Sequence, residues 1–218
     1  FEASGRPPAI LMVHGGPTSQ HPAEYEGRAQ FFATRGCAVL DVNYRGSTGY
    51  GRDYRDALKG KWGEADVQDV VAGAEHLVDE GLADPDRLVV MGGSAGGYTV
   101  LQALVNHPGF FAAGISMYGI SNLFSLAMDT HKFEQHYNDT LVGSLPEASD
   151  LFRERSPIFH ADQIADPVGV FQGAEDKVVP KAQSDEIVAS LEKRGIPHTY
   201  EVYESEGHGW RQPDTIEK

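Results

Sequence analysis

The stretch Met91–Gly97, "MGGSAGG", places four glycines around a single serine. Glycine inside a helix or strand costs roughly 0.5–1 kcal/mol relative to alanine, so such a cluster indicates backbone that bends sharply or packs closely. The apolar run "RLVVM" before it indicates a buried strand, and "YTVLQALVNH" after it has apolar residues at helical spacing. Strand, glycine turn and helix are the context of the G-x-S-x-G nucleophile elbow, with Ser94 at its centre. A glycine-rich turn that binds a phosphate, or binds nothing, fits the same residues, so the decision depends on the rest of the chain.

The composition is that of an ordinary globular protein. With 218 residues, of which 40% are hydrophobic, the chain is long enough for a core, and we expect residues 1–218 to form a single domain. The net charge of −14, without any cluster of Lys and Arg, argues against nucleic acid and against an anionic membrane as partners. No apolar stretch approaches the roughly 20 residues of a membrane span, and the start "FEASGRPP" does not resemble a signal peptide. The single cysteine, Cys37, excludes an internal disulfide, and a cytoplasmic location is expected.

Apolar runs alternate with helical segments along the chain. This pattern predicts an α/β fold with a mostly parallel sheet flanked by helices. The expected strands are Ala9–His14, Ala38–Tyr44, Leu88–Gly93, Phe111–Gly119, Pro167–Gly173 and His198–Glu204. Helices are expected over Ala23–Gly36, Glu64–Gly81 and Lys181–Gly195, each ending at a glycine. The long segment Ile120–Pro157 interrupts the alternation, and insertions at the carboxyl edge of such a sheet usually build substrate pockets or lids.

Two further residues complete a candidate for nucleophilic catalysis. A serine hydroxyl needs a base to take its proton and an acid to hold that base in the right tautomer. In the elbow arrangement these partners follow in the order Ser, Asp or Glu, His, each on a loop after a strand. Asp176, in "FQGAEDKVVP", follows the fifth expected strand, and His208, in "EGHGW", follows the sixth. The positions predict a catalytic triad of Ser94, Asp176 and His208, although an acidic loop or one histidine alone is usually a surface feature.

Other residues compete for these roles. Glu175 and Asp185 are alternative acids, but Asp176 lies at the tip of the expected turn, whereas Asp185 falls inside an expected helix. His131 and His136 are five residues apart, a spacing that does not suit a metal pair on one helix face, and no cysteine or acid near them has ligand spacing. We therefore expect neither a metal nor a cofactor.

The segment His14–Pro17, "HGGP", follows the first expected strand. It resembles the glycine-rich oxyanion loop of lipases and esterases. Acyl transfer needs hydrogen-bond donors aimed at the developing oxyanion, each contributing about 3–4 kcal/mol. We expect the backbone N–H groups of Gly16 and Ala95 to be these donors; an ordinary glycine loop is the alternative.

Taken together, these motifs resemble the catalytic domain of the prolyl oligopeptidase family of serine peptidases. "HGGP", "NYRGSTGYG", "GGSAGG", "FQGAEDKVVP" and "EGHGW" occur in that order over nearly the whole chain. "DTHKFEQHY" and "FRERSP" are similar to its acylaminoacyl-peptidase and dipeptidyl-peptidase-like bacterial members. The resemblance implies an α/β-hydrolase fold and hydrolysis of short peptides at an amide bond, through an acyl-enzyme on Ser94. It also implies homo-oligomers that control access to the site.

The resemblance further implies a primary substrate pocket. Its apolar residues would be Ile120, Leu123, Phe124 and Val179, each of which also suits the core. Two other hypotheses fit the same residues: a broad-specificity carboxylesterase, because the same machinery cleaves esters more easily than amides, and a non-catalytic scaffold or binding domain that retains the fold.

The chain also departs from the family pattern. Nothing in it corresponds to the family's β-propeller, "AILMVH" resembles the third strand of the hydrolase fold, and the chain ends ten residues after His208, where the family continues into a terminal helix. We therefore expect a domain truncated at both ends relative to the family. Ala95 stands where tyrosine is common, and His14 stands where some members place a tyrosine in the oxyanion hole.

Overall fold

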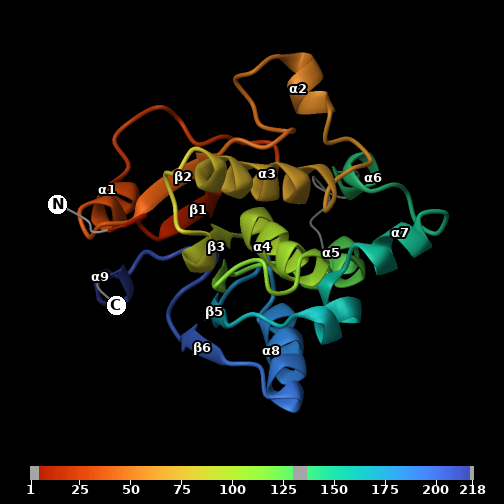
Figure 1. Cartoon of the computed structure of the whole chain (residues 1–218). Helices are drawn as coiled ribbons and strands as arrows, with labels where there is room; N and C mark the ends of the chain where they lie inside the picture. The colour runs from red at the N-terminus through yellow and green to blue at the C-terminus, as the bar shows by residue number, and fades with distance from the viewer. Residues whose placement is uncertain (1–4, 130–136, 217–218) are drawn as a thin grey trace.

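The structure, a computed structural model, describes residues 5–129 and 137–216. Within these residues six strands form one sheet in the order β2-β1-β3-β4-β5-β6, and each strand runs parallel to its neighbours (Figure 1). The strands are β1 (Ala9–Val13), β2 (Ala38–Val42), β3 (Leu88–Gly93), β4 (Ala113–Met117), β5 (Val168–Gly173) and β6 (His198–Tyr203). All six expected strands are present, with ends displaced by two residues at most. The predicted α/β-hydrolase fold is confirmed, with a sheet that is parallel throughout the described chain.

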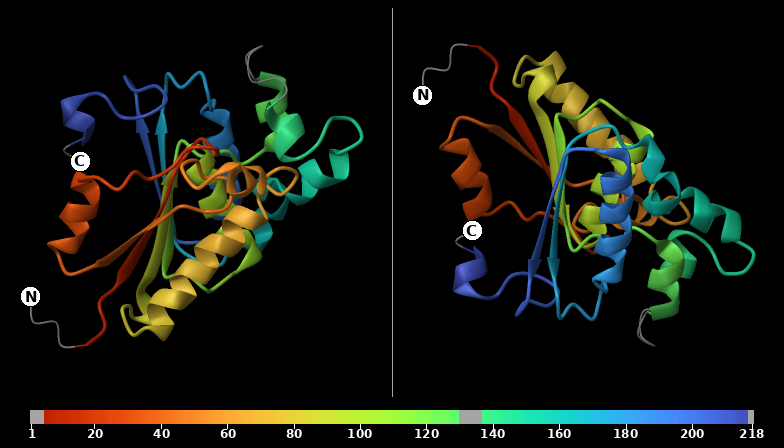
Figure 2. Two further views of the ribbon diagram at one scale, coloured as in Figure 1. Left: turned by 90° about the horizontal axis from the view of Figure 1, so that it is seen from above. Right: turned by 90° about the horizontal axis from the view of Figure 1, so that it is seen from below.

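Helices cover both faces of the sheet. The longer ones are α3 (Ala65–Asp79), α4 (Ala95–Asn106) and α8 (Ala182–Arg194). The others are α1 (Gly27–Ala33), α2 (Arg52–Asp56), α5 (Leu123–Asp129), α6 (Tyr137–Leu141), α7 (Ser149–Glu154) and α9 (Pro213–Ile216), with 3-10 turns at Pro85–Arg87 and Pro157–Gln163. Figure 2 shows α3, α4 and α8 on one face, and α1 and α9 on the other.

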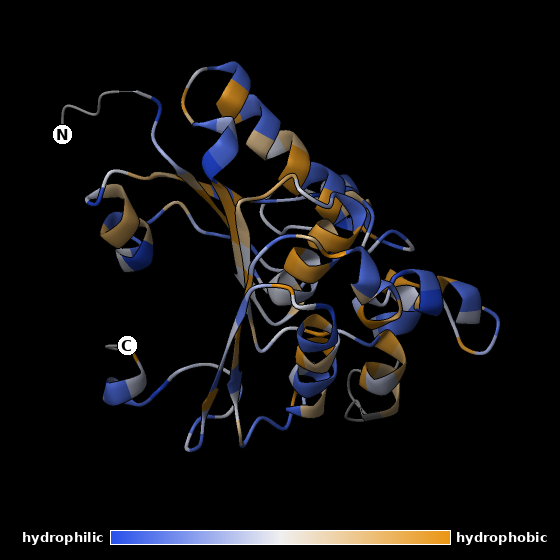
Figure 3. Cartoon of the chain, turned by 60° about the horizontal axis from the view of Figure 1, so that its bottom comes forward, coloured by the Kyte–Doolittle hydropathy of each residue, from blue (hydrophilic) through white to orange (hydrophobic). Residues whose placement is uncertain are grey.

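The strand residues divide between two hydrophobic clusters because successive side chains point to opposite faces. In β1, Leu11 and Val13 pack toward α3 and α4, whereas Ile10 and Met12 belong to a smaller cluster with Met91 on the α1 face. All five β1 residues are buried, as expected for a central parallel strand. In Figure 3 the central strands accordingly appear mostly in hydrophobic colours.

The first helix and the insertion differ from expectation. Helix α1 begins only at Gly27, because the Glu26 carboxylate caps it by accepting a hydrogen bond of 2.7 Å from the N–H of Ala29. The segment Ile120–Pro157, expected to interrupt the alternation and to build a substrate pocket or lid, contains the short helices α5, α6 and α7. His131 and His136 lie outside the described residues.

The turn after β3 has the geometry that its glycines suggest. A Cβ built on Gly96 would lie 2.2 Å from the carbonyl oxygen of Val13, and one on Gly92 would lie 2.6 Å from the backbone of Gly96. Strand β3 and helix α4 therefore meet backbone to backbone, which only glycine permits. Between them Ser94 has φ 56°, a strained value for a residue with a side chain, as in a nucleophile elbow.

Parallel strands bring their carboxyl ends to one edge of the sheet. The loop His14–Thr18 follows β1, Ser94 follows β3, Asp176 follows β5 and His208 follows β6. The candidate residues, far apart in sequence, therefore share one edge of the molecule. Across the described ranges, no helix combines the length and the apolar character that a bilayer span requires.

Candidate active site

Ser94, His208 and Asp176 form a continuous hydrogen-bonded row. The Oγ of Ser94 lies 2.9 Å from Nε2 of His208, and Nδ1 of His208 lies 2.8 Å from Oδ2 of Asp176. Because a carboxylate only accepts, Nδ1 carries the proton of the neutral imidazole, and Nε2 is left to accept the proton of Ser94. This arrangement can deprotonate the serine.

The carboxylate of Asp176 is buried and fully engaged. Its side chain is 0% exposed, and Oδ1 accepts from the N–H groups of Val178 at 2.8 Å and Val179 at 2.9 Å. Oδ2 accepts from the amide of Gln172 as well as from His208. The competing acids lie elsewhere: Glu175 is exposed, and Asp185 pairs with Lys181 and with the hydroxyl of Tyr200.

The loop that carries His208 is closed by Glu206. This carboxylate accepts hydrogen bonds from the N–H of Arg211 at 2.9 Å and from that of Gln212 at 2.7 Å, on the far side of His208. The carbonyl of Glu206 accepts from the N–H of Glu175, which joins this loop to the loop of Asp176. The ring of Tyr118 packs edge-on against His208 at 4.8 Å. The imidazole is therefore held by its neighbours as well as by its two hydrogen bonds.

The predicted oxyanion donors flank Ser94. A Cβ built on Gly15 would lie 3.5 Å from the Cβ of Ser94, so the glycine loop runs directly against the nucleophile. Gly16 has φ +124°, a conformation that other residues rarely adopt. Ala95 is the first residue of α4, where the N–H has no acceptor within its own helix. Among the described residues, neither N–H finds a hydrogen-bond partner.

Two tyrosine side chains from separate parts of the chain hold the loop His14–Thr18. The hydroxyl of Tyr44, which follows β2, contacts the carbonyl oxygens of His14 at 3.2 Å and Pro17 at 2.9 Å. From α6, the hydroxyl of Tyr137 accepts from the N–H of Thr18 at 3.2 Å and also contacts the Thr18 hydroxyl. The insertion is thereby bonded directly to the glycine loop.

A cavity of about 250 Å³ opens beside Ser94. Of the four predicted pocket residues, Ile120 and Val179 line it, together with Trp62, Leu126, Tyr137 and Asn138. The expectation for Leu123 and Phe124 requires correction. Leu123 is 1% exposed in the core, where its N–H donates to the Ser156 hydroxyl, and Phe124 packs against Phe152 and Phe159. The start of α5 turns these two side chains inward, and neither is among the described residues that line the cavity.

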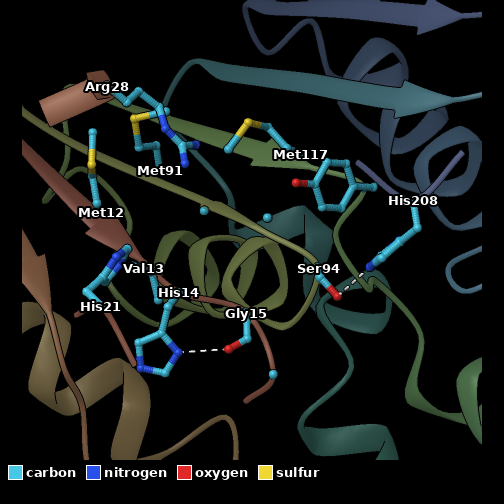
Figure 4. Close-up of a pocket in the computed structure, with 14 residues that line it drawn as sticks. Met12, Val13, His14, Gly15, His21, Arg28, Met91, Ser94, Met117 and His208 are labelled. Atoms are coloured by element: carbon cyan, nitrogen blue, oxygen red, sulfur yellow. Dashed lines mark hydrogen bonds between the residues drawn. The ribbon is translucent and has the colours of Figure 1, made fainter. Parts of the chain in front are cut away.

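A second cavity, of about 430 Å³, lies on the other side of Ser94 and His208. Met12, Met91 and Met117 lie at its apolar side, with Arg28 and His21 at other positions on its wall (Figure 4). Within residues 5–129 and 137–216, no group of three or more His, Cys, Asp or Glu side chains is arranged to hold a metal ion.

A buried acid supports the helix that begins at Ala95. Asp66 is 0% exposed and accepts hydrogen bonds of 2.6 Å from both the N–H of Gly63 and the hydroxyl of Thr99, one turn along α4. Burial raises the pKa of Asp66 to about 6, although these hydrogen bonds oppose the shift.

Comparison with known proteins assigns the sequence to a family. The sequence profile of the prolyl oligopeptidase family matches residues 23–218. The chain belongs to the prolyl oligopeptidase family. Dipeptidyl aminopeptidase BIII of Pseudoxanthomonas mexicana is 37% identical over 212 residues, 95% of this chain and 31% of that protein. The acylamino-acid-releasing enzyme of Arabidopsis thaliana is 31% identical over 215 residues, 95% of this chain and 28% of that protein.

A solved peptidase structure agrees closely with the fold. The puromycin-hydrolyzing peptidase of Mycobacterium tuberculosis is 45% identical and aligns with a TM-score of 0.94, over 97% of this chain and 33% of that one. The chain therefore spans about a third of the length of these relatives.

Several residues around the site were not identified from the sequence. Glu206 stands two residues before His208 in the quoted motif "EGHGW", which was its only signal. Tyr118 has φ 41°, and Tyr137 reaches a threonine 119 residues away. No local pattern predicts either feature.

Proposed function

We propose that this chain is the hydrolytic unit of a serine peptidase that cleaves amide bonds of short peptides. The observation that carries the proposal is the pair of hydrogen bonds from Ser94 Oγ to His208 Nε2, at 2.9 Å, and from His208 Nδ1 to Asp176 Oδ2, at 2.8 Å. Membership of the prolyl oligopeptidase family supports it.

The reaction begins at the hydroxyl of Ser94. His208 takes the hydroxyl proton as Oγ forms a bond to the substrate carbonyl carbon, and the carbonyl oxygen becomes an oxyanion between the N–H groups of Gly16 and Ala95. The protonated His208 then gives its proton to the leaving nitrogen as the C–N bond breaks, which leaves an acyl-enzyme. Water, deprotonated by His208, hydrolyses this ester and restores Ser94. Asp176 keeps its charge and orients the imidazole throughout.

The cavity of about 250 Å³ is the proposed acyl pocket. Among the described residues that line it, His208 and Tyr137 are the ones with ionisable side chains, and tyrosine is neutral at ordinary pH. An uncharged substrate side chain therefore suits this pocket best. Ile120 and Val179 are the proposed apolar contacts. By their names, dipeptidyl aminopeptidase BIII and the acylamino-acid-releasing enzyme act on different amino-terminal groups, so experiment decides between a blocked and a free amino end.

The test compares three substrates: an N-acetyl-alanyl anilide, a free-amine dipeptidyl anilide and a simple aryl ester. The proposed peptidase turns over at least one anilide, and Ser94→Ala abolishes that turnover. Ser190→Ala, a serine-to-alanine change on α8 away from the site, is the matched control and retains wild-type rates.

Each outcome distinguishes between functions. Turnover of the ester alone identifies a carboxylesterase and refutes the peptidase. Failure of all three substrates, together with absence of a Ser94-dependent mass shift from a fluorophosphonate probe, indicates a non-catalytic domain.

We also propose a cytoplasmic location, which the single cysteine Cys37 supports. We further propose that the protein is a homo-oligomer. Light scattering that gives a monomer at working concentration refutes the homo-oligomer.

A further inference from the structure

The imidazole of His14 is enclosed within the glycine loop rather than directed at Ser94. Its Nδ1 lies 2.8 Å from the carbonyl oxygen of Gly15, and its Nε2 lies 2.7 Å from the hydroxyl of Ser47. The ring is 6% exposed and stacks on Tyr44 at 4.3 Å. Both nitrogens are therefore engaged, so the ring does not act on an oxyanion as a side-chain donor would.

The proton on His14 can be placed from its partners. The carbonyl of Gly15 only accepts, so Nδ1 must donate to it. Burial lowers the pKa of His14 to about 4, so the ring has one N–H at neutral pH, and that N–H is on Nδ1. Nε2 then accepts from the hydroxyl of Ser47. The Ser47 hydroxyl also lies 2.7 Å from the carbonyl oxygen of Tyr44, so its single proton has two possible acceptors. When that proton goes to Nε2, the Tyr44 carbonyl keeps a donor, because the backbone N–H of Ser47 donates to it at 2.9 Å.

The carbonyl that His14 holds belongs to the same peptide unit as the N–H of Gly16. This unit is planar, and since the cis bonds of the described chain are Gly16–Pro17 and Leu145–Pro146, it is trans. In a trans peptide the carbonyl and the N–H point in opposite directions. Holding the Gly15 oxygen toward His14 therefore directs the Gly16 N–H to the opposite side. With glycine at both ends, side chains do little to limit rotation of this peptide.

We propose that His14 is a positioning residue, whose Nδ1–H holds the Gly15 carbonyl and thereby aims the Gly16 N–H at the oxyanion beside Ser94. The hydrogen bond is drawn in Figure 4, next to the Ser94–His208 pair. Tyr44 secures the two ends of the loop through the carbonyls of His14 and Pro17, while His14 secures the peptide between them. This inference rests on the proposed function.

The test uses two substitutions at one position. The side-chain amide of His14→Asn places a donor near the site of Nδ1, whereas His14→Leu has similar bulk and no donor. For His14→Leu we expect kcat on the aryl ester to fall about 10–100-fold, below the loss of about 10²–10³ when an oxyanion donor is removed outright. KM stays within about twofold, because the aimed N–H acts mainly in the transition state. His14→Asn recovers most of kcat.

A second readout reports on the oxyanion itself. A peptidyl trifluoromethyl ketone forms an anionic hemiketal on the serine, so its affinity should fall in His14→Leu by the same factor as kcat, while that of a simple product acid is unchanged. His160→Leu, the same change at a half-buried histidine of the 3-10 turn Pro157–Gln163, is the matched control and leaves both unchanged.

The results that overturn the inference are specific. They are wild-type kcat in His14→Leu, equal losses in His14→Leu and His14→Asn, or a loss that appears in KM instead of kcat. If His14→Leu does not fold, Ser47→Ala frees Nε2 and should lower kcat and hemiketal affinity together; an unchanged kcat then refutes the inference. A wild-type chain that turns over neither ester nor anilide refutes the proposed function as well, whereas an active wild type with an insensitive His14 refutes this inference alone.

Discussion

Replacing Asp176 by asparagine is expected to remove most of the activity while leaving the fold in place. The side chain keeps its shape but exchanges one carboxylate oxygen for an amide nitrogen. Because Oδ1 accepts from two backbone N–H groups that cannot turn away, the amide oxygen takes that position. The new NH₂ group then faces the amide of Gln172 and Nδ1 of His208.

This exchange reverses the proton arrangement of His208. To meet an N–H donor, Nδ1 must become the acceptor, which moves the ring proton to Nε2, where it faces Ser94 and prevents proton abstraction. The opposite orientation of the amide leaves the N–H groups of Val178 and Val179 without an acceptor, at about 1–3 kcal/mol each. Loss of the correct tautomer lowers kcat by about 10³–10⁴ in such triads, equivalent to about 4–5.5 kcal/mol.

The assay is steady-state hydrolysis of the aryl ester, with the rate of fluorophosphonate labelling measured in parallel. Both rates should fall by similar factors, since both require a deprotonated Ser94. Thermal unfolding tests the fold. The contact between two NH₂ groups costs about 1–3 kcal/mol, so Tm should drop by only several degrees.

Asp185→Asn provides the matched control. Asp185 pairs with Lys181 at 2.6 Å and with Tyr200, away from His208, and its variant should keep kcat within about twofold. A kcat for Asp176→Asn within tenfold of wild type, in a folded variant, refutes the reasoning.

Three further changes test other contacts. Tyr137→Phe removes the hydroxyl bonded to Thr18 and should lower kcat about fivefold, the worth of one hydrogen bond; a loss in KM alone contradicts this. Glu206→Ala removes the acceptor for the backbone N–H groups that close the His208 loop and should lower kcat about tenfold. A variant with the kcat of the wild type contradicts this role of Glu206. Burial raises the pKa of Asp66 above its unfolded value, so its contribution to stability is complete below about pH 4 and is lost as pH rises through about 6, by roughly 3 kcal/mol. The free energy of unfolding of Asp66→Asn, measured in urea, should therefore rise relative to that of the wild type between pH 4 and pH 7. A difference between the two proteins that does not change with pH contradicts this assignment.

The sheet and the row of reactive side chains could be predicted because their signals are local. Each parallel strand is a short apolar run, and Ser94, Asp176 and His208 each come shortly after one. Parallel strands end at a common edge, so chain order alone implies that these residues approach one another. The close backbone contact at Gly92 and Gly96 is similarly implied by composition, since few other structures require so many glycines.

The walls of the site could not be predicted, because they depend on contacts between distant parts of the chain. Leu123 and Phe124 face the core because Ser156 and Phe152, some thirty residues later, pack there. Apolar residues such as these suit the wall of a pocket equally well, so the sequence alone does not distinguish the two locations. The bond from Tyr137 to Thr18 spans 119 residues. The role of His14 depends on the direction of a peptide plane, which no pattern of side chains encodes.

The contact between Gly92 and Gly96 has a consequence for how this sequence can vary. Where side chains separate a helix from a strand, their spacing follows side-chain volume and shifts with each substitution. Here main-chain atoms set the spacing, because a Cβ built on Gly92 would already lie 2.6 Å from the backbone of Gly96. Substitutions in the core around α4 can therefore change stability without displacing Ser94. Substitutions in the surrounding core therefore leave the position of Ser94 unchanged, whereas a single methyl group on Gly92 or Gly96 would displace it.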